Sequence, residues 1–176
     1  MKKMDRVFLI GPPAAGKTTI GRRWARQLRI PFYDTDAEII RRTGYSIREW
    51  FDRGEPAFRA IEREIITQTI IENTRGIWAV GGGFPAQSGA MTLLNSTGYT
   101  VWIDPPPEWL LSRLRHPATE RPLLEGLSDD ERLFLIERRR VYYRYADLHW
   151  RPDMVPENLL LAWIKHQFRA FSEEEF

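Results

Sequence analysis

A glycine-bounded loop that ends in a lysine and a threonine is the stretch of the sequence most directly tied to chemistry. Residues 11–18 read GPPAAGKT and match the phosphate-binding pattern G-x-x-x-x-G-K-[ST]. Gly11 and Gly16 permit a backbone whose N–H groups point inward at phosphate oxygens, and a helix that follows the loop adds its positive dipole end. Lys17 can reach the terminal phosphates, and the hydroxyl of Thr18 can bind Mg²⁺. The loop therefore predicts a bound nucleoside triphosphate.

Two aspartates, Asp34 and Asp36, stand two positions apart just after a short apolar run. In an extended chain their side chains would face the same side. One carboxylate could then hold Mg²⁺ or its waters, and the other could hydrogen-bond or deprotonate an acceptor hydroxyl. Aspartates are also favoured at helix N-termini, so two helix caps are the alternative. The spacing leaves both interpretations open.

Three further features could contribute to a site, and each has a structural alternative. Arg59 and Glu62 are three positions apart on an expected helix, where a surface ion pair is the simplest interpretation. Gly81-Gly82-Gly83 is costly to order, which favours close approach of a ligand to the backbone over a flexible turn. Arg121 lies in a polar loop and suits either a lid that closes over transferring phosphate or a solvent-exposed position.

The elements that must position these residues alternate along the chain. An apolar run at 7–10 precedes the phosphate loop, and helical spacing follows the loop. Further strands are expected at 30–33, 77–80, 100–103 and 147–150. Helices are expected from 17 or 18 onward, around 39–44, from 46, and over 55–73, 89–95, 107–115, 128–145 and 156–171. This order predicts an α/β fold, a three-layer parallel sheet of about five strands with helices on both faces. Ligands bind such sheets at the carboxyl ends of the strands, so the loop, the aspartates and the glycines should converge on one crevice.

The composition indicates one globular domain. The chain has 176 residues, a formal net charge of +2 and no cysteine, which excludes disulfides and Cys-ligated zinc. The 26 basic and 24 acidic residues are dispersed, so a nucleic-acid partner is not expected. The N-terminal apolar segment is too short for a signal peptide or a membrane span, and a cytoplasmic enzyme is the simplest class. His116, His149 and His166 have no partner at metal-ligand spacing.

The order of these motifs resembles the shikimate kinase family of small P-loop kinases over about residues 5 to 150. The matching stretches are 11–18, 34–36, 41–47, 54–62, 81–83, 121–124 and 137–147. The resemblance implies a P-loop kinase domain over 1–176, with a shikimate-binding helical region at about 36–62 and a lid at about 116–126. It implies transfer of the γ-phosphate of ATP, with Mg²⁺, to the 3-hydroxyl of shikimate in aromatic amino acid and chorismate biosynthesis, by a monomer.

The resemblance also implies roles for individual residues on the reacting side. Asp36 would hold the shikimate hydroxyls and orient or activate the attacking oxygen. Asp34 would be an outer-sphere partner of Mg²⁺, next to Thr18. Lys17 and Arg121 would be catalytic, with Arg121 neutralising charge during transfer.

Binding residues follow from the same resemblance. Arg59 and Arg138 would clamp the shikimate carboxylate with their planar guanidinium forks, with Glu62 fixing Arg59, and the three glycines would offer N–H groups near the substrate. The expected ATP-binding residues are Gly11, Ala14, Ala15, Gly16, Lys17, Thr18, Thr19, Arg115, Arg121 and Pro156.

Some positions depart from the family pattern. Pro12 and Pro13 remove two N–H donors from the phosphate loop, so the phosphate cradle should rest on the amides from Ala14 to Thr18. Arg140-Val141 stands where Pro-Leu is usual. These departures leave two alternatives: a kinase for another small acceptor, such as gluconate or a nucleotide, and a non-catalytic ATP-binding module.

Overall fold

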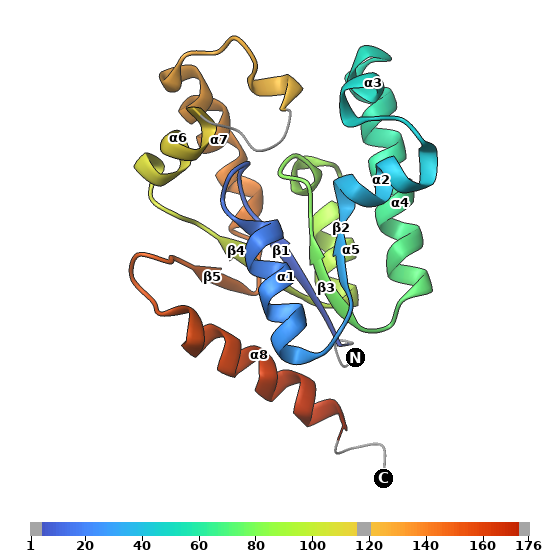
Figure 1. The fold of residues 1–176 in the computed structure, drawn as a ribbon, viewed down its shortest axis with the longest axis vertical. Helices are drawn as coiled ribbons and strands as arrows, with labels where there is room; N and C mark the ends of the chain where they lie inside the picture. The colour runs from blue at the N-terminus through green and yellow to red at the C-terminus, as the bar shows by residue number, and fades with distance from the viewer. Residues whose placement is uncertain (1–4, 116–120, 173–176) are drawn as a thin grey trace.

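A computed structural model describes residues 5–115 and 121–172 and contains one parallel sheet (Figure 1). Its five strands run in the order β2-β3-β1-β4-β5, and every neighbouring pair is parallel. The strands are β1 Arg6–Ile10, β2 Phe32–Asp34, β3 Gly76–Ala79, β4 Tyr99–Ile103 and β5 Leu148–Trp150. The expected fold class is therefore confirmed, and each strand falls within two residues of its expected position.

Helices connect the strands, as right-handed crossovers in a parallel sheet require. The helices are α1 Lys17–Leu28, α2 Thr35–Thr43, α3 Ile47–Asp52, α4 Glu55–Glu72, α5 Ala90–Thr97, α6 Pro107–Arg115, α7 Asp129–Tyr143 and α8 Glu157–Ser172. Two short 3₁₀ turns, η1 Phe84–Ala86 and η2 Pro122–Leu124, were not expected from the sequence. Among the described helices, none combines the length and the apolar character needed to cross a membrane.

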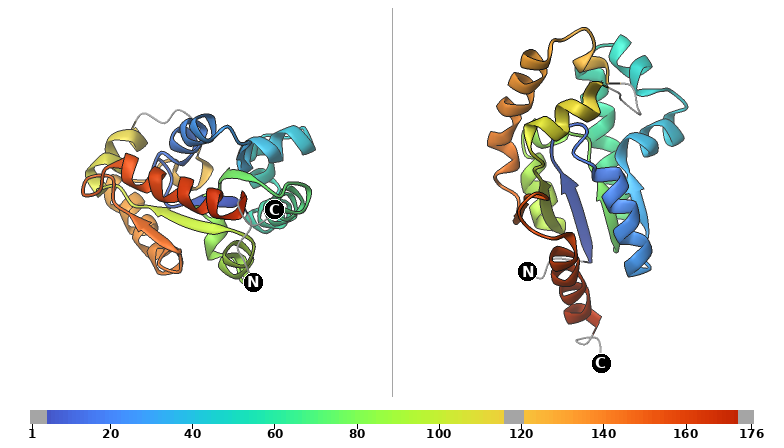
Figure 2. Two further views of the ribbon diagram at one scale, coloured as in Figure 1. Left: turned by 90° about the horizontal axis from the view of Figure 1, so that it is seen from below. Right: turned by 60° about the vertical axis from the view of Figure 1, so that its left-hand side comes forward.

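The alternation of side chains along β1 divides the core into two layers. Val7 and Leu9 point to the face covered by α1, α6 and α8, whereas Phe8 and Ile10 point to the face covered by α4, α5 and the C-terminal end of α7. Figure 2, left, shows α1 and α8 on one side of the strands and α7 on the other. All five residues of β1 are buried, as expected for a central strand of a sheet covered on both faces.

Helices α2, α3 and α4 form a small unit with its own apolar cluster beside the strand ends, at the right of Figure 1. Ile39, Phe58 and Ile65 are its buried members. The start of α3 is closed by a capping box, in which Glu49 N donates to Ser46 Oγ (3.2 Å) and Ser46 N donates to Glu49 Oε2 (2.6 Å). This unit coincides with the helical region expected at 36–62.

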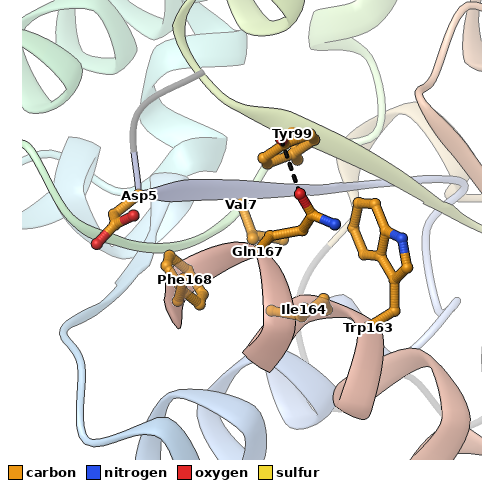
Figure 3. Close-up of a pocket in the computed structure, with 7 residues that line it drawn as sticks. All are labelled: Asp5, Val7, Tyr99, Trp163, Ile164, Gln167 and Phe168. Carbon is orange, nitrogen blue, oxygen red and sulfur yellow. Dashed lines mark hydrogen bonds between the residues drawn. The ribbon is translucent and has the colours of Figure 1, made fainter. Parts of the chain in front are cut away.

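Helix α8 is fastened to the opposite end of the sheet (Figure 3). The hydroxyl of Tyr99 donates to Gln167 Oε1 (3.0 Å), and the ring of Trp163 meets Tyr99 edge-on at 5.4 Å. The space enclosed there by Val7, Ile164 and their neighbours is too narrow for a water molecule. This contact therefore holds α8 in place and is no ligand site.

Candidate active site

A cleft of about 1070 Å³ opens where the strands end, between the α2–α4 unit and helices α6 and α7. The phosphate loop, both aspartates and the three glycines all line it, so the expected convergence is confirmed. Its volume exceeds that of most single-ligand pockets and suits two ligands side by side. The charged side chains on its wall are Lys17, Arg22, Arg23, Asp34, Asp36, Arg59, Glu62, Arg113, Arg121, Arg139 and Glu157.

The phosphate loop takes the backbone that its glycines permit. Gly11 and Gly16 have φ values of 142° and 96°, and a Cβ at Gly11 would lie 2.5 Å from the carbonyl oxygen of Ile103. Ala14 also has a positive φ of 65°, a conformation that an L-residue adopts at some cost. The two prolines sit within a turn closed by a hydrogen bond from Ala15 N to Pro12 O (3.2 Å). The loop therefore forms without the two missing N–H groups.

Lys17 begins α1 and turns back over the loop. Its Nζ donates to the carbonyl oxygens of Gly11 and Pro12, each at 2.8 Å. Burial lowers the pKa of Lys17 to about 7, with a further decrease from Arg121 that the aspartates oppose. An ammonium held in this environment gains much from a nearby phosphate, because an anion restores the solvation that burial removes.

Asp34 caps a helix and also lies beside the hydroxyl of Thr18, so its position is compatible with both a capping role and a metal-binding role. It ends β2 and caps α2, accepting through Oδ1 from Asp36 N (3.1 Å) and Ala37 N (3.2 Å). Its other oxygen, Oδ2, accepts from the hydroxyl of Thr18 at 2.6 Å. Two oxygen ligands beside a phosphate loop fit Mg²⁺, which is usually bound by one or two protein groups and by substrate phosphates and waters.

Asp36 lies in the first turn of α2 and faces the cleft. The surrounding protein raises its pKa to about 6, and Asp34 adds to the rise, while Lys17, Arg59 and Arg121 oppose it. The carboxylate still meets solvent in the cleft. Asp36 therefore carries its charge at neutral pH and has an affinity for protons closer to that of a general base than an ordinary aspartate.

Arg59 and Glu62 form an ion pair, but not on the surface. Arg59 Nη1 donates to Glu62 Oε2 at 2.8 Å, and the side chain of Glu62 is only 1% exposed. Gln87 Nε2 also donates to Glu62 Oε2 (2.7 Å). Burial raises the pKa of Glu62 to about 7, with Arg59 opposing and Asp36 adding to the rise. On its exposed side Arg59 is held by Glu55 as well (3.1 Å).

The triple glycine is explained by the side chains packed against it. A Cβ at Gly81 would lie 2.6 Å from Glu62 Oε1, and one at Gly83 would lie 2.6 Å from Arg59 Nη1. At Gly82 the nearest atoms belong to the phosphate loop, with the carbonyl oxygen of Gly11 at 3.1 Å. The glycines therefore let the ends of β3, β1 and α4 approach one another within the site.

Arg121 lines the cleft at the start of η2. Its Nη1 is buried and has no hydrogen-bond partner among the described residues. Burial lowers the pKa of its guanidinium, and Asp36 opposes this. A buried, unpaired guanidinium nitrogen facing a cleft is suited to an anionic ligand. Residues 116–120 of the expected lid lie outside the described residues.

The expected position of Arg138 in the cleft is wrong. Arg138 is exposed, and its guanidinium lies 5.8 Å from the centre of the exposed Phe134 ring. Arg139 lines the cleft instead. It stands one helical turn before Tyr143, which is buried and donates from its hydroxyl to Gly82 O (2.6 Å). Successive residues of a helix point about 100° apart, so a register shifted by one position along α7 selects Arg138 in place of Arg139.

Two expected ATP contacts also lie elsewhere. Arg115 is exposed and pairs with Asp129 at 2.7 Å, and Pro156 does not line the cleft. Arg113, two positions earlier on α6, lines the cleft and donates from Nη1 to the carbonyl oxygen of Ala14 (3.0 Å). The wall of the cleft also includes Pro105, Trp109, Ser112, Trp150 and Pro152. Of the other expected ATP residues, Gly11 is buried behind the loop, and Thr19 lines the cleft.

Comparison with known proteins identifies the family. The family model described as shikimate kinase matches residues 13–165. The chain belongs to the shikimate kinase family. The shikimate kinase of Bacteroides fragilis is 37% identical over 171 residues, covering 94% of this chain and 95% of that protein. The shikimate kinase of Aquifex aeolicus is 37% identical over 156 residues, covering 88% of this chain and 91% of that protein.

Solved structures agree with this assignment. The shikimate kinase of Bacteroides thetaiotaomicron has a TM-score of 0.78 at 34% identity, with 97% of this chain and 99% of that chain covered. The shikimate kinase of Acinetobacter baumannii in complex with shikimate has a TM-score of 0.79 at 27% identity, with 99% and 97% covered. As a shikimate kinase, the protein is an ATP-dependent phosphotransferase of aromatic amino acid biosynthesis.

Proposed function

We propose that this shikimate kinase transfers the γ-phosphate of ATP to the 3-hydroxyl of shikimate through Asp36, with Lys17 on the donor side and Arg59 on the acceptor side. The observation that carries the proposal is the position of Asp36, whose charge interacts with Lys17, Arg59 and Arg121 across one cleft. A carboxylate between a phosphate-binding lysine and an anion-binding arginine is where an acceptor hydroxyl must lie for in-line transfer.

The donor side consists of the phosphate loop and the residues beside it. The amides from Ala14 to Thr18 and the ammonium of Lys17 hold the phosphates of ATP. The hydroxyl of Thr18 would bind Mg²⁺, and the carboxylate of Asp34, 2.6 Å from that hydroxyl, would hold the ion through its water shell. When bound, Mg²⁺ neutralises charge that develops on the phosphate oxygens.

On the acceptor side, Asp36 accepts the hydrogen bond of the shikimate 3-hydroxyl and takes its proton. The hydroxyl oxygen forms a bond to the γ-phosphorus, while the bond from that phosphorus to the β–γ bridging oxygen breaks and ADP leaves. With a pKa of about 6, Asp36 is ionised at pH 7 and ready to accept the proton. Arg121 offers its unpaired Nη1 to the negative charge of the phosphoryl group in transfer.

The carboxylate of shikimate is held by Arg59 and Arg139. Both line the cleft, and Arg59 is fixed by its buried partner Glu62. Two guanidinium groups can bind one carboxylate through several charge-assisted hydrogen bonds, and a nucleotide acceptor has no carboxylate to use them. Arg139 takes the role that the sequence assigned to Arg138.

The test is a coupled ADP-release assay with a panel of acceptors at fixed ATP and Mg²⁺. Shikimate should stimulate ADP release, and gluconate and nucleoside monophosphates should not. Methyl shikimate, which keeps the 3-hydroxyl and lacks the carboxylate charge, should show a KM raised at least about tenfold, the loss of one charge-assisted contact. Equal KM values for the acid and the ester would overturn the assignment of the arginines. A better acceptor in the panel would overturn shikimate as the substrate.

A further inference from the structure

A second group of charged side chains lies just behind the cleft, around the buried carboxylate of Asp104 at the end of β4. Asp104 is 4% exposed. Arg140 of α7 donates to it from both terminal nitrogens, Nη1 to Oδ1 at 2.6 Å and Nη2 to Oδ2 at 3.0 Å. Nε2 of His149, on β5, lies 2.7 Å from Oδ2. One carboxylate thus connects three elements that are distant in sequence.

The ring of Trp102 completes this group. His149 stacks on it at 4.0 Å and an interplanar angle of 9°, and the guanidinium of Arg140 lies 4.7 Å from the ring centre. Because Trp102 is only 4% exposed, Arg140 and His149 are both held in one orientation against a rigid surface. A bidentate arginine–carboxylate pair also fixes the direction of the guanidinium plane.

The three polar residues of this group, Asp104, Arg140 and His149, each have a chain neighbour in the cleft. Pro105 follows Asp104, Arg139 precedes Arg140, and Trp150 follows His149, and all three neighbours line the cleft. Pro105 and Trp150 are also positioned by the sheet, through the hydrogen bond from Asp104 N to Trp150 O (2.9 Å) and the pairing of Ile103 with Trp150. Arg139 has no such backbone anchor, because it lies inside a helix.

The rotation of helix α7 about its own axis decides whether Arg139 faces the cleft. Successive residues of a helix point about 100° apart, so a small rotation of α7 would turn Arg139 away from the cleft. Tyr143 anchors the C-terminal end through its hydrogen bond to Gly82 O. The two hydrogen bonds from Arg140 to Asp104 fix the helix a second time, at the residue next to Arg139. Together the two anchors fix both the position and the rotation of the last turns of α7.

We propose that Asp104 is a positioning residue for acceptor binding, which acts through Arg140 to direct Arg139 at the shikimate carboxylate. The inference rests on the proposed role of Arg139.

The experiment is a mutant cycle on the full chain, with steady-state kinetics for both substrates. Arg140→Gln removes the ion pair from its partly exposed side, and Asp104→Asn removes it from the buried side. Each is expected to raise the KM for shikimate by about three- to tenfold, with kcat and the KM for ATP changed less than about twofold. Arg139→Lys alone is expected to raise the same KM by about tenfold or more. Each variant is checked for folding by its thermal unfolding midpoint.

The combination of Arg140→Gln with Arg139→Lys decides the mechanism. A residue that acts only by positioning Arg139 has little left to do once Arg139 is replaced, so the double variant should match Arg139→Lys within about twofold. If the fold-changes in the KM for shikimate of the two single variants multiply in the double variant, Arg140 acts independently of Arg139. That result would overturn the inference. An unchanged KM in Arg140→Gln and Asp104→Asn would overturn it too.

A matched control is available on the same helix. Asp129→Asn removes the exposed pair between Asp129 and Arg115 and should leave the KM for shikimate unchanged. A rise equal to that of Arg140→Gln would show that any lost charge pair on α7 has the same effect, against the inference. If Arg139→Lys itself leaves the KM unchanged, the proposed role of Arg139 fails. If it raises the KM while Arg140→Gln does not, only the inference about Asp104 fails.

Discussion

The guanidinium of Arg59 is held at 2.8 Å by the carboxylate of Glu62, a side chain that has almost no contact with solvent. The same arginine is held from its exposed side by Glu55, at 3.1 Å. The two ion pairs differ in strength because their carboxylates differ in exposure. Water and salt screen the charge of the exposed Glu55, whereas the charge of the buried Glu62 is screened little. Glu62 therefore defines where Arg59 points, and Glu55 contributes little.

Replacing Glu62 should accordingly weaken acceptor binding. Glu62→Gln keeps the shape of the side chain but removes its charge, so Arg59 is less firmly oriented, and the KM for shikimate should rise about five- to twentyfold with little change in the KM for ATP. Glu55→Gln is the matched control and should change either KM less than about twofold. Equal effects of the two variants would contradict the assignment of the positioning role to Glu62.

The two neighbouring arginines of α7 should behave differently. Arg139→Ala should raise the KM for shikimate by about 10- to 100-fold, because a charge-assisted contact to the carboxylate is lost. Arg138→Ala should change it less than about twofold, because Arg138 is exposed and does not line the cleft. Steady-state kinetics at saturating ATP measure both, and the reverse order of effects would restore the expectation drawn from the sequence.

Asp36 should control both the rate and its dependence on pH. Asp36→Asn should lower kcat by about 10²- to 10⁴-fold, the range for loss of a general base, while nucleotide binding persists. In the unaltered protein, kcat/KM for shikimate should fall below a pH of about 6, where Asp36 becomes protonated. A rate that stays flat down to pH 5 would show that proton transfer to Asp36 is not needed.

Lys17 should lower stability while supporting turnover. Lys17→Met should reduce kcat by about 10²-fold or more, since a donor to the transferring phosphate is lost. In the absence of nucleotide the same variant should have a higher urea midpoint at pH 7. Burial lowers the pKa of Lys17 from 10.5 to about 7, which means that the folded protein holds the lysine charge at a cost in stability, and methionine removes that cost. The unaltered protein should gain stability as pH rises from 7 to 10.5, so the advantage of the variant should shrink there.

Glu62 should give stability the opposite dependence on pH. Its pKa is 4.5 in the unfolded chain and about 7 in the folded protein, so the folded state holds more protons between these values. The free energy of unfolding should therefore fall as pH rises from 4.5 to 7. Urea titrations across this range measure the slope, and Glu62→Gln should flatten it. A slope unchanged in that variant would assign the effect to other groups.

Local sequence rules account for most of the fold. The strand before the glycine-rich loop, the capping box at Ser46 and the proline at the start of α6 each specify their element without distant contacts. The 3₁₀ turns at 84–86 and 122–124 escaped prediction because their three residues carry no periodicity. The strand order depends on which strand pairs with which, and no local pattern encodes that.

The candidate site was predictable where residue type alone suffices, as for Lys17, Thr18 and Asp34 at strand ends. It was not predictable where helix rotation decides, and Arg138 and Arg115 were each misplaced by one or two positions for that reason. The burial of Glu62 was not predictable either. An arginine and a glutamate three positions apart give the same sequence pattern whether the helix face lies on the surface or in a cleft. The monomeric state, the cytoplasmic location and closure of a lid over 116–126 stay predictions.

Gly83 leaves no room for a methyl group beside the guanidinium of Arg59. Any side chain at that position would push the arginine aside, so a neutral substitution there amounts to the loss of a positive charge. The same holds at Gly81 for the carboxylate of Glu62. Two uncharged glycines therefore help to set the electrostatics of the acceptor pocket, because they leave the space that Arg59 and Glu62 occupy. A substitution at either glycine would have the same effect on shikimate binding as loss of the ion pair between Arg59 and Glu62.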